Sequence, residues 1–343
     1  MTLYSYHISH EQCPPRALLA LAQRAEQAGF DGAFSSDHLQ PWSPSQGESG
    51  FAWAWLGAAL QATERLTFGI ISVPGGWRYH PVVLAQAVAT LGQMFPGRVP
   101  WVALGSGQAM NERATGGPWP DKAERNARLR EGAEIMRALL AGETVTQRGR
   151  LTAVDAKVWS LPETPTRLVG AATSVETAAW LGTWADGLLT VGTSPEALGP
   201  IVDAFRESGG ADKPVFLKMD LSYAPDPAEA LHQAHAEWRF NALPASVAWE
   251  LPRPADFEAA ARYLRPEDMH EAVLISHDLP ALTERIAACA ALGFDSIDLH
   301  QVGGNQAAFI DAFGERVLPA LHGRKAPVIE FDPFGRKPAA RAG

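Results

Sequence analysis

TFGIISV (67–73), HPVVLAQAVATLGQM (80–94) and VPWVALGSG (99–107) follow one another in the chain and show the unit from which it is built. The first and third stretches are apolar on consecutive positions, as expected of strands buried on both faces of a parallel sheet. The middle stretch begins near Pro81, and proline is tolerated in the first turn of a helix because its missing N–H would have no partner there. The three stretches therefore predict a strand, a helix and a second, parallel strand.

This unit recurs along the whole chain. Eight alternations with no evident switch in order favour a closed barrel over an open, doubly wound sheet, so we expect the α/β class and a (β/α)8 TIM barrel with insertions. The expected strands cover residues 3–9, 32–38, 67–73, 99–107, 167–173, 187–193, 215–224 and 296–303. The expected helices cover residues 14–28, 51–63, 81–94, 121–141, 174–183, 195–208, 226–240 and 305–320.

Two internal segments and the end of the chain depart from this repeat. Residues 143–160 alternate like an inserted hairpin, and residues 241–280 are typical of an irregular, partly helical insertion. Residues 322–343 have little apolar periodicity, which predicts a loose tail. We expect one barrel domain over residues 1–321 that carries both insertions.

The composition narrows the class of function. Among 343 residues, 29 Lys and Arg against 38 Asp and Glu give a formal net charge of −9, which disfavours a nucleic-acid partner. Cys13 and Cys289 are isolated, and such sparse use favours a reducing compartment over a disulfide framework. The start of the chain lacks a signal-peptide pattern and the apolar runs are short, so we expect a cytoplasmic protein without membrane contact.

A metal site is not expected. His7 and His10 are three residues apart, and the geometry of a strand puts them on opposite faces. The sequence also shows no cluster of Cys, Asp or Glu that would complete a coordination shell around them.

Polar residues, glycines and aromatic residues follow several of the expected strands. In a barrel of this kind the active site lies at the carboxyl ends of the strands. Here those ends carry SSDHLQPW (35–42), GSGQAMNE (105–112) and AATS (171–174), among others. Their convergence on one rim predicts a cofactor pocket.

Three segments, in this order and spacing, resemble the signature blocks of the luciferase-like flavin oxidoreductases. They are SSDHLQPW, GGWRYHPVVLAQAVATLGQMFPGRV (75–99) and GSGQAMNE. The resemblance covers nearly the whole chain and is closest to the branch of deazaflavin (F420)-dependent glucose-6-phosphate dehydrogenases. It implies that His38 is the catalytic histidine and that the neighbouring Asp37 contacts the cofactor. From their adjacency we also expect Asp37 to orient His38. It also implies that Trp42 forms a wall of the reaction site and that Glu11 faces the same pocket.

The same resemblance implies cofactor contacts from other strands. A cis peptide that does not precede proline would end the third strand, at Ile71–Ser72 or Ser72–Val73, and bulge against the flavin. Such a bond costs about 3–4 kcal/mol and usually marks a functional position. In the loop after the fourth strand, three residues fall on cofactor-binding positions: Ser106, Gly107 and Asn111.

The sequence departs from the deazaflavin branch at positions that bear on the cofactor. The glutamate that serves that branch as an acid–base partner is Gln108 here, which forms hydrogen bonds but cannot trade a proton. The two glycines that wrap the cofactor phosphate are replaced by Thr173–Ser174, directly after Ala172. Hydroxyls and N–H groups at the start of a helix suit an FMN phosphate, so these changes predict FMN in place of F420.

Two further departures bear on the substrate. The two lysines that bind sugar phosphate in that branch match Ser194 and Glu271 here. Recognition of a phosphate depends on such cations. Glucose 6-phosphate is therefore not expected as a substrate.

We expect a flavin-dependent oxidoreductase, as a homodimer, that transfers a hydride between a small organic substrate and bound FMN while His38 moves the accompanying proton. Oxygen as the acceptor would make it a monooxygenase. The alternatives are an F420-dependent dehydrogenase or reductase on the same fold, a catalytically silent flavin-binding protein, and a purely structural role for His38. An unrelated barrel aldolase or hydrolase is disfavoured because the sequence shows no convincing barrel lysine with acid partners.

Overall fold

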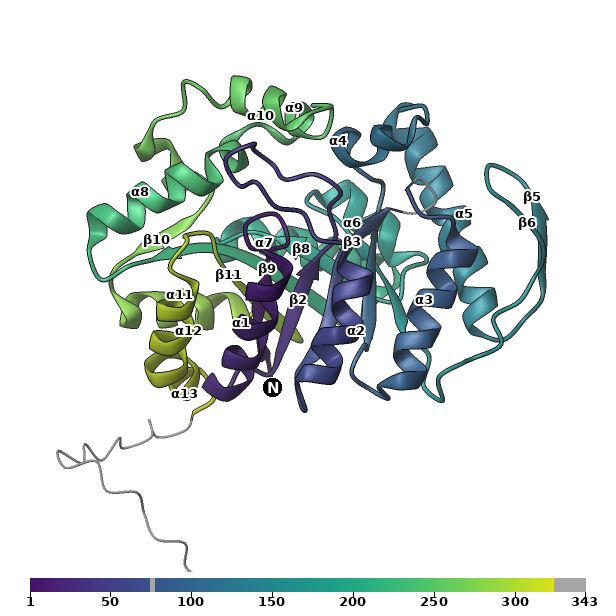
Figure 1. The fold of residues 1–343 in the computed structure, drawn as a ribbon, viewed down its shortest axis with the longest axis horizontal. Coiled ribbons are helices and arrows are strands. Elements are labelled where there is room, and N and C mark those ends of the chain that lie inside the picture. The colour runs from purple at the N-terminus through teal and green to yellow at the C-terminus, as the bar shows by residue number, and fades with distance from the viewer. Residues whose placement is uncertain (75–77, 324–343) are drawn as a thin grey trace, which may run out of the picture.

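The computed structural model describes residues 1–74 and 78–323, and these residues form a closed barrel of eight parallel strands (Figure 1). The strands follow the order of the chain around the barrel, and β9 closes it by pairing with β8 on one side and β11 on the other. The prediction of a (β/α)8 barrel is confirmed. The barrel strands are β1 (Leu3–Ile8), β2 (Gly32–Ser36), β3 (Thr67–Pro74), β4 (Trp101–Gly105), β7 (Arg167–Ala171), β8 (Leu188–Val191), β9 (Val215–Tyr223) and β11 (Ser296–Gln301).

Helices surround the barrel, and most of them start at the residues that the sequence indicates. Side chains cap several of these helices, because a short polar side chain accepts a hydrogen bond from a backbone N–H that the first turn leaves unpaired. Asp121, Ser174, Ser194 and Asp226 do so at the starts of α5, α6, α7 and α8. The helices are α1 (Pro15–Ala28), α2 (Ala52–Ala62), α3 (Pro81–Met94), α5 (Lys122–Leu140), α6 (Val175–Gly182), α7 (Pro195–Phe205), α8 (Pro227–Trp238), α11 (Leu279–Ala290), α12 (Gln306–Ala312) and α13 (Leu318–Leu321).

Two elements were not expected from the sequence. The short strand β10 (Leu274–Ser276) pairs with the far end of β9, and α11 follows it. Both lie at or directly after the segment 241–280, where proline and charged residues break the apolar periodicity. Asp278 caps α11 by accepting a hydrogen bond from the N–H of Ala281, so the helix start is encoded locally although the preceding strand is very short.

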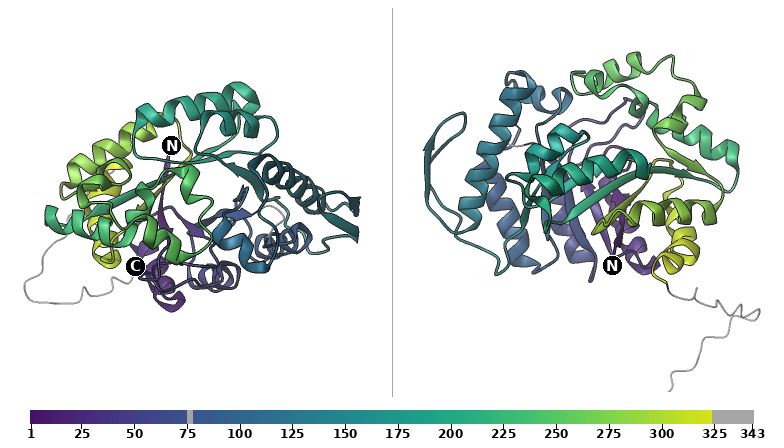
Figure 2. Two further views of the ribbon diagram at one scale, coloured as in Figure 1. Left: turned by 90° about the horizontal axis from the view of Figure 1, so that it is seen from above. Right: turned by 180° about the vertical axis from the view of Figure 1, so that it is seen from behind.

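The insertions lie at two different places on the barrel. Residues 143–160 contain the antiparallel hairpin β5 (Val145–Arg148) and β6 (Thr152–Ala156), which projects from the side of the barrel next to α5 (Figures 1 and 2). Residues 241–280 contain the short helices α9 (Ala245–Ala248) and α10 (Pro254–Ala260), which lie on the same side of the molecule as α4 (Ala109–Glu112) (Figure 1). The N–H of Ala109 donates to the carbonyl of Trp249, which ties this second insertion to α4.

Along the barrel strands, side chains that fill the barrel interior alternate with side chains that pack against the surrounding helices. In β4, Trp101 and Ala103 point into the barrel, whereas Val102 and Leu104 pack against the helices. Trp101 lies so close to Gly69 of β3 that a β-carbon on Gly69 would be 2.0 Å from the indole ring. This packing closes the barrel beneath its carboxyl end, where the strands open into the cavity described below.

The predicted cis peptide at the end of β3 is wrong. The described residues contain no cis peptide bond. Instead, the pairing of β3 with β4 shifts register between Ile70 and Val73, so an irregularity with trans peptides lies at this position. The side chain of Ser72 lies outside the described part of the chain. Within the described ranges, none of the helices combines the length and the apolar character needed to cross a bilayer.

Candidate active site

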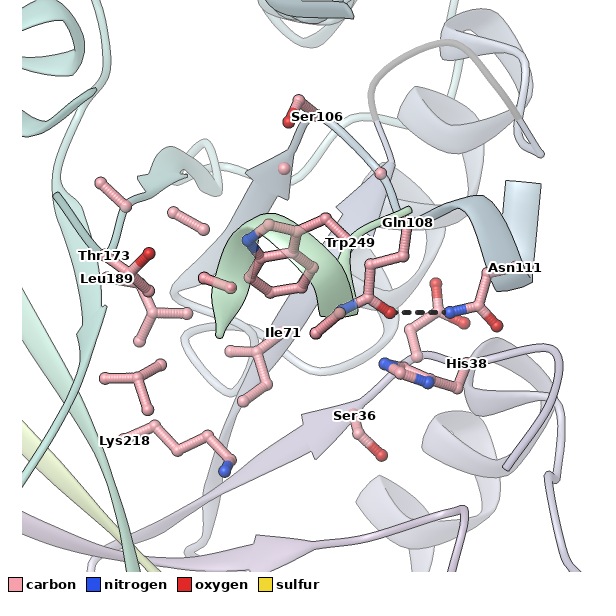
Figure 3. A pocket seen from close by; sticks show the side chains of 18 of the residues that line it. Ser36, His38, Ile71, Ser106, Gln108, Asn111, Thr173, Leu189, Lys218 and Trp249 are labelled. Carbon is pink, nitrogen blue, oxygen red and sulfur yellow. Dashed lines mark hydrogen bonds between the residues drawn. The ribbon is translucent and has the colours of Figure 1, made fainter. Parts of the chain in front are cut away.

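A cavity of about 400 Å³ opens at the carboxyl end of the barrel (Figure 3). The structure places Val73 in the outer core, away from this cavity, and Ser174 is not among the residues that line it. Ser194 and Glu271 are not among the lining residues either. The predicted site residues that do line the cavity are Glu11, Asp37, His38, Trp42, Ser106, Gly107, Gln108, Asn111, Ala172 and Thr173.

His38 and Glu11 form a loosely joined pair in this cavity. Nδ1 of His38 lies 3.4 Å from Oε1 of Glu11 and makes no hydrogen bond with a described residue. Burial lowers the pKa of His38 below its ordinary value, although the Glu11 carboxylate offsets part of this effect. His38 is therefore a neutral imidazole near pH 7 and can accept a proton.

Glu11 is held as an anion by the ends of two strands. Oε2 of Glu11 accepts hydrogen bonds from the hydroxyl of Ser36, at 2.7 Å, and from that of Ser9, at 3.1 Å. Burial alone would raise the pKa of Glu11, but His38 and the hydrogen bond from Ser36 bring it below its ordinary value. Glu11 thus remains charged beside the imidazole and favours its protonated form.

The prediction that Asp37 orients His38 is wrong, because Asp37 faces a different group of side chains. Oδ1 of Asp37 accepts hydrogen bonds from the hydroxyl of Tyr79, at 2.9 Å, and from Nη1 of Arg78, at 3.3 Å. Arg78 also lies 3.7 Å from Glu112, whose pKa burial raises to about 7. Asp37 therefore anchors the start of the His38 loop to the Arg78 segment.

Trp42 lies beside His38 and forms part of an aromatic wall. The ring centroids of Trp42 and His38 are 4.8 Å apart. On its other side Trp42 stacks on Phe240, with centroids 5.5 Å apart and ring planes inclined by 13°. Phe257 of α10 also packs edge-on against Trp42, with ring centroids 5.4 Å apart, so the insertion that contains α10 helps to fix the indole ring against the imidazole.

The loop after β4 holds the His38 loop in place. Oδ1 of Asn111 accepts hydrogen bonds from the N–H groups of Leu39 and Gln40, and its Nδ2 donates to Oε1 of Gln108 at 3.1 Å (Figure 3). Gly107 has a φ of +86°, a backbone conformation that favours glycine. These contacts give Asn111 a positioning role in addition to its place on the cavity wall.

The end of β7 reaches the cavity opposite His38. Ala172 and Thr173 line the cavity, and Thr173 is exposed towards its mouth. Ser174 uses its hydroxyl to cap α6, where it accepts from the N–H of Thr177 and donates to the Thr177 hydroxyl. Lys122 of α5 lies beside this segment, with Nζ 3.3 Å from Oγ1 of Thr177. A cation, Lys122, and the hydroxyl of Thr173 therefore flank this edge of the cavity.

Residues 3–296 match the family model described as luciferase-like monooxygenase. The chain belongs to the luciferase-like monooxygenase family. It is 39% identical to the F420-dependent glucose-6-phosphate dehydrogenase of Beutenbergia cavernae, over 96% of this chain and 100% of that protein. The predicted branch of the luciferase-like family is thereby confirmed.

Solved structures of luciferase-like proteins agree with this assignment. An F420-dependent secondary alcohol dehydrogenase in complex with an F420–acetone adduct superimposes with a TM-score of 0.86 and 29% identity, over 94% of this chain and 99% of that one. A second structure is the oxygenating constituent of a diketocamphane monooxygenase from Pseudomonas putida, in complex with FMN. It has a TM-score of 0.66 and is 16% identical, over 93% of this chain and 99% of that one. The second likeness shows the fold alone. This luciferase-like chain is an oxidoreductase.

A second charged group in the cavity was missed from the sequence. Lys218 of β9 lines the cavity and forms an ion pair with Asp220, two residues further along the strand. Asp220 also lies 2.7 Å from Nδ1 of His300 and 3.2 Å from Nδ2 of Asn241. The expectation that the barrel lacks a lysine with acid partners is therefore wrong. The signal was present in VFLKMDLSYA (215–224), because a Lys and an Asp two residues apart in an apolar strand share one face.

Next to this group lies a further buried pair. Nδ1 of His7 is 2.6 Å from Oδ2 of Asp298, and the rings of His7 and His300 are 4.0 Å apart. Burial lowers the pKa of His7 well below its ordinary value and raises that of Asp298 well above its own. Burial therefore opposes a charge on either group, and the pair extends the polar floor of the cavity.

Proposed function

We propose that this luciferase-like chain is an F420-dependent dehydrogenase that oxidises a hydroxyl group of a small organic substrate. With F420 bound, the carbon that bears the hydroxyl would give up a hydride to the cofactor, and His38 would take the hydroxyl proton. The observation that carries the proposal is the neutral, buried imidazole of His38. Its Nδ1 is 3.4 Å from the Glu11 carboxylate and its ring lies against Trp42, inside the cavity.

The choice of F420 over FMN rests on two observations. The relative that is 39% identical over nearly the full length is named as F420-dependent, whereas the FMN complex is only 16% identical. In addition, the Ser174 hydroxyl, on which the expectation of FMN partly depended, caps α6 and lies outside the cavity lining. The argument from that hydroxyl for an FMN phosphate therefore no longer holds.

The residues of the cavity suit a flat tricyclic ring with a phosphate-bearing tail. Ile71 lies in the middle of the cavity, and Leu189 extends this apolar surface towards Thr173 (Figure 3). The backbone of Gly107 and the exposed hydroxyl of Thr173 lie towards its edge, and Lys122 stands beside Thr173 at the mouth. We assign the apolar surface to the ring, and Thr173 and Lys122 to the phosphate, because a cation and a hydroxyl donor suit that anion.

When bound, the deazaflavin provides a two-electron hydride acceptor. The chain itself handles the proton. His38 is neutral and accepts the hydroxyl proton as the carbonyl forms, and the Glu11 anion then stabilises the imidazolium. Trp42 and Phe240 exclude water from one side of the imidazole. Gln108 does not titrate and contributes through its hydrogen bond with Asn111.

Mixing the purified protein and oxidised F420 with primary alcohols, secondary alcohols and sugars tests this function. We expect at least one hydroxyl compound to bleach the visible absorbance of F420 in a reaction that saturates with substrate concentration. Addition of the corresponding carbonyl product to reduced F420 and enzyme should restore that absorbance. If no hydroxyl compound reduces F420 although F420 binds, the dehydrogenase proposal is wrong and a silent binder is favoured.

A further inference from the structure

The Lys218–Asp220 pair stands apart from the proton-handling pair but faces the same chamber. Nζ of Lys218 lies 5.4 Å from the centroid of the Trp238 ring, and the Trp238 and Trp42 rings are 6.4 Å apart. Trp42 in turn contacts His38. Two indole rings thus connect Lys218 to His38 along one wall of the cavity. In Figure 3 the Lys218 side chain points into the cavity, on the other side of Ile71 from His38.

Lys218 has hydrogen-bonding capacity that the protein does not use. An ammonium group donates three hydrogen bonds. Among the described residues, Asp220 alone is seen to accept one from Nζ of Lys218. The Lys218 side chain is only 12% exposed, so its remaining donors point into an enclosed space. A buried donor without a partner is costly, and a bound molecule with acceptor oxygens removes that cost.

Asp220 provides a hydrogen-bond acceptor beside the donors of Lys218. Oδ1 of Asp220 is engaged by Lys218 and His300, while among the described residues Oδ2 accepts only from Asn241, at 3.2 Å. A carboxylate oxygen has room for a second hydrogen bond. Lys218 and Asp220 together therefore present a donor and an acceptor side by side, which is the arrangement that a hydroxyl group, itself both donor and acceptor, satisfies completely.

The charge of the cavity excludes a phosphate as the group that binds here. The described lining residues include four basic side chains, Arg78, Lys122, Arg125 and Lys218, and four acidic ones, Glu11, Asp37, Glu112 and Asp220. Lys218, Arg78 and Arg125 each have a carboxylate partner, and that of Arg125 is Glu250, 3.1 Å away. Lys122 lies at the mouth, where the cofactor phosphate is assigned. A dianionic substrate would find no uncompensated cation inside.

We infer that the Lys218–Asp220 pair is the subsite for a second hydroxyl of the substrate, and that the substrate is a neutral sugar or polyol. This inference rests on the proposed function and gives its substrate class. A simple apolar alcohol leaves the Lys218 donors unpaired. A sugar phosphate brings charge that the cavity does not balance. A neutral sugar meets both requirements, and the aromatic side chains of Trp42 and Trp238 line the same chamber.

The substrate preference of the unaltered protein tests this first. With F420 bound, kcat/KM is measured for glucose, glucose 6-phosphate and 2-propanol, and a series of neutral sugars and polyols extends the panel. We expect the best neutral sugar or polyol to exceed both other compounds by at least about tenfold, as expected where a site hydrogen-bonds a substrate hydroxyl. A preference for the phosphate ester or for 2-propanol overturns the inference and leaves the dehydrogenase proposal intact. Failure of F420 to bind overturns the dehydrogenase proposal instead.

Substitution of the subsite tests the assigned residues. Lys218→Met should lower kcat/KM for the best sugar by about 10–100-fold, mainly through KM, and should leave F420 affinity within a factor of about two to three. Lys157→Met, the same change at an exposed position on the hairpin segment, is the control and should alter neither. Direct binding of the sugar, followed by calorimetry in the presence of F420, should weaken in parallel. Unchanged sugar affinity in a folded Lys218→Met protein contradicts the assignment. If Lys218→Met does not fold, Lys218→Arg is used, since the planar guanidinium should also alter the sugar preference.

Discussion

The two charged pairs of the cavity differ in how firmly the protein holds them. His38 and Glu11 are 3.4 Å apart, and Nδ1 of His38 has no hydrogen-bond partner among the described residues. Asp220, by contrast, contacts Lys218, His300 and Asn241 together. A loosely held base can take up and release a proton with little structural cost. A carboxylate with three partners keeps its charge and orients its neighbours. This difference suits the proposed roles, which are proton transfer for His38 and Glu11 and substrate recognition for Lys218 and Asp220.

The largest expected effect is on the proton-handling side. His38→Ala should lower the rate of F420 reduction by about 10²–10⁴, the usual contribution of a positioned acid–base group, while the melting temperature and F420 affinity change little. His232→Ala, at an exposed position of α8, is the control. Single-turnover reduction and thermal unfolding are measured on one preparation. If the variant has a lower melting temperature but reduces F420 at the parent rate, His38 is a packing residue. The two pairs then do not differ in the way proposed.

For the Lys218–Asp220 pair, the expected effect is on the free energy of unfolding. Asp220→Asn removes one charge of a buried pair, and such changes cost about 3–5 kcal/mol in the free energy of unfolding. Lys218 and the hydrogen bond from His300 hold the pKa of Asp220 below its ordinary value, against the effect of burial. The stabilisation is therefore present above the ordinary carboxylate pKa and is lost as the pH falls below it. Denaturant unfolding near pH 7 and near pH 2.5 should show a smaller difference between the two proteins at the lower pH. An equal difference at both values would show that charge is not the cause.

A smaller effect is expected for the partner of the base. Glu11→Gln should lower turnover by about tenfold and move the acid limb of the pH–rate profile to lower pH by roughly one pH unit. The direction follows from the sign of the interaction. The Glu11 carboxylate raises the pKa of His38, so its removal lets His38 stay neutral in more acidic solution. A limb that moves to higher pH, or does not move, would mean that Glu11 does not act on His38.

The smallest effect is expected at the position where the deazaflavin branch has its glutamate. Gln108→Glu should change turnover far less than the factor of about 10² that marks a positioned acid–base group, because His38 and Glu11 already handle the proton. Asn111→Asp is a useful companion, since it alters the hydrogen-bond partner of Gln108 instead. A gain above that factor in Gln108→Glu would show that the natural chain is catalytically silent and lacks its acid.

Much of the fold follows from local patterns. All eight barrel strands lie within one to two residues of the predicted starts and within a few of the predicted ends, because strands buried on both faces are apolar on consecutive positions. α11 and β10 were missed because the proline-rich insertion before them hides the periodicity. The insertion itself also contributes Ala245, Ala248 and Trp249 to the cavity wall, which its irregular sequence does not suggest.

The site residues were predictable by family pattern, but their partners were not. His38, Trp42 and Glu11 come together in the cavity as the motifs imply. Asp37 is the sequence neighbour of His38, yet adjacent residues of an extended chain point to opposite sides, so the carboxylate faces Arg78. The actual partner, Glu11, comes from the loop after β1. Likewise the spacing of Lys218 and Asp220 places both on one face of β9, but the sequence does not show that this face points into the barrel, where Asp220 meets His300 of β11.

Equilibrium titration of the purified protein with F420 and with FMN tests the central claim most directly, since every step proposed here depends on the deazaflavin. Both cofactors are followed by their own fluorescence on one protein preparation, with Lys122→Met as the variant that probes the assigned phosphate edge. The account predicts that F420 binds with a Kd at least about tenfold lower than FMN, a difference of about 1.4 kcal/mol, and that Lys122→Met weakens this binding. Tighter binding of FMN than of F420 would contradict it.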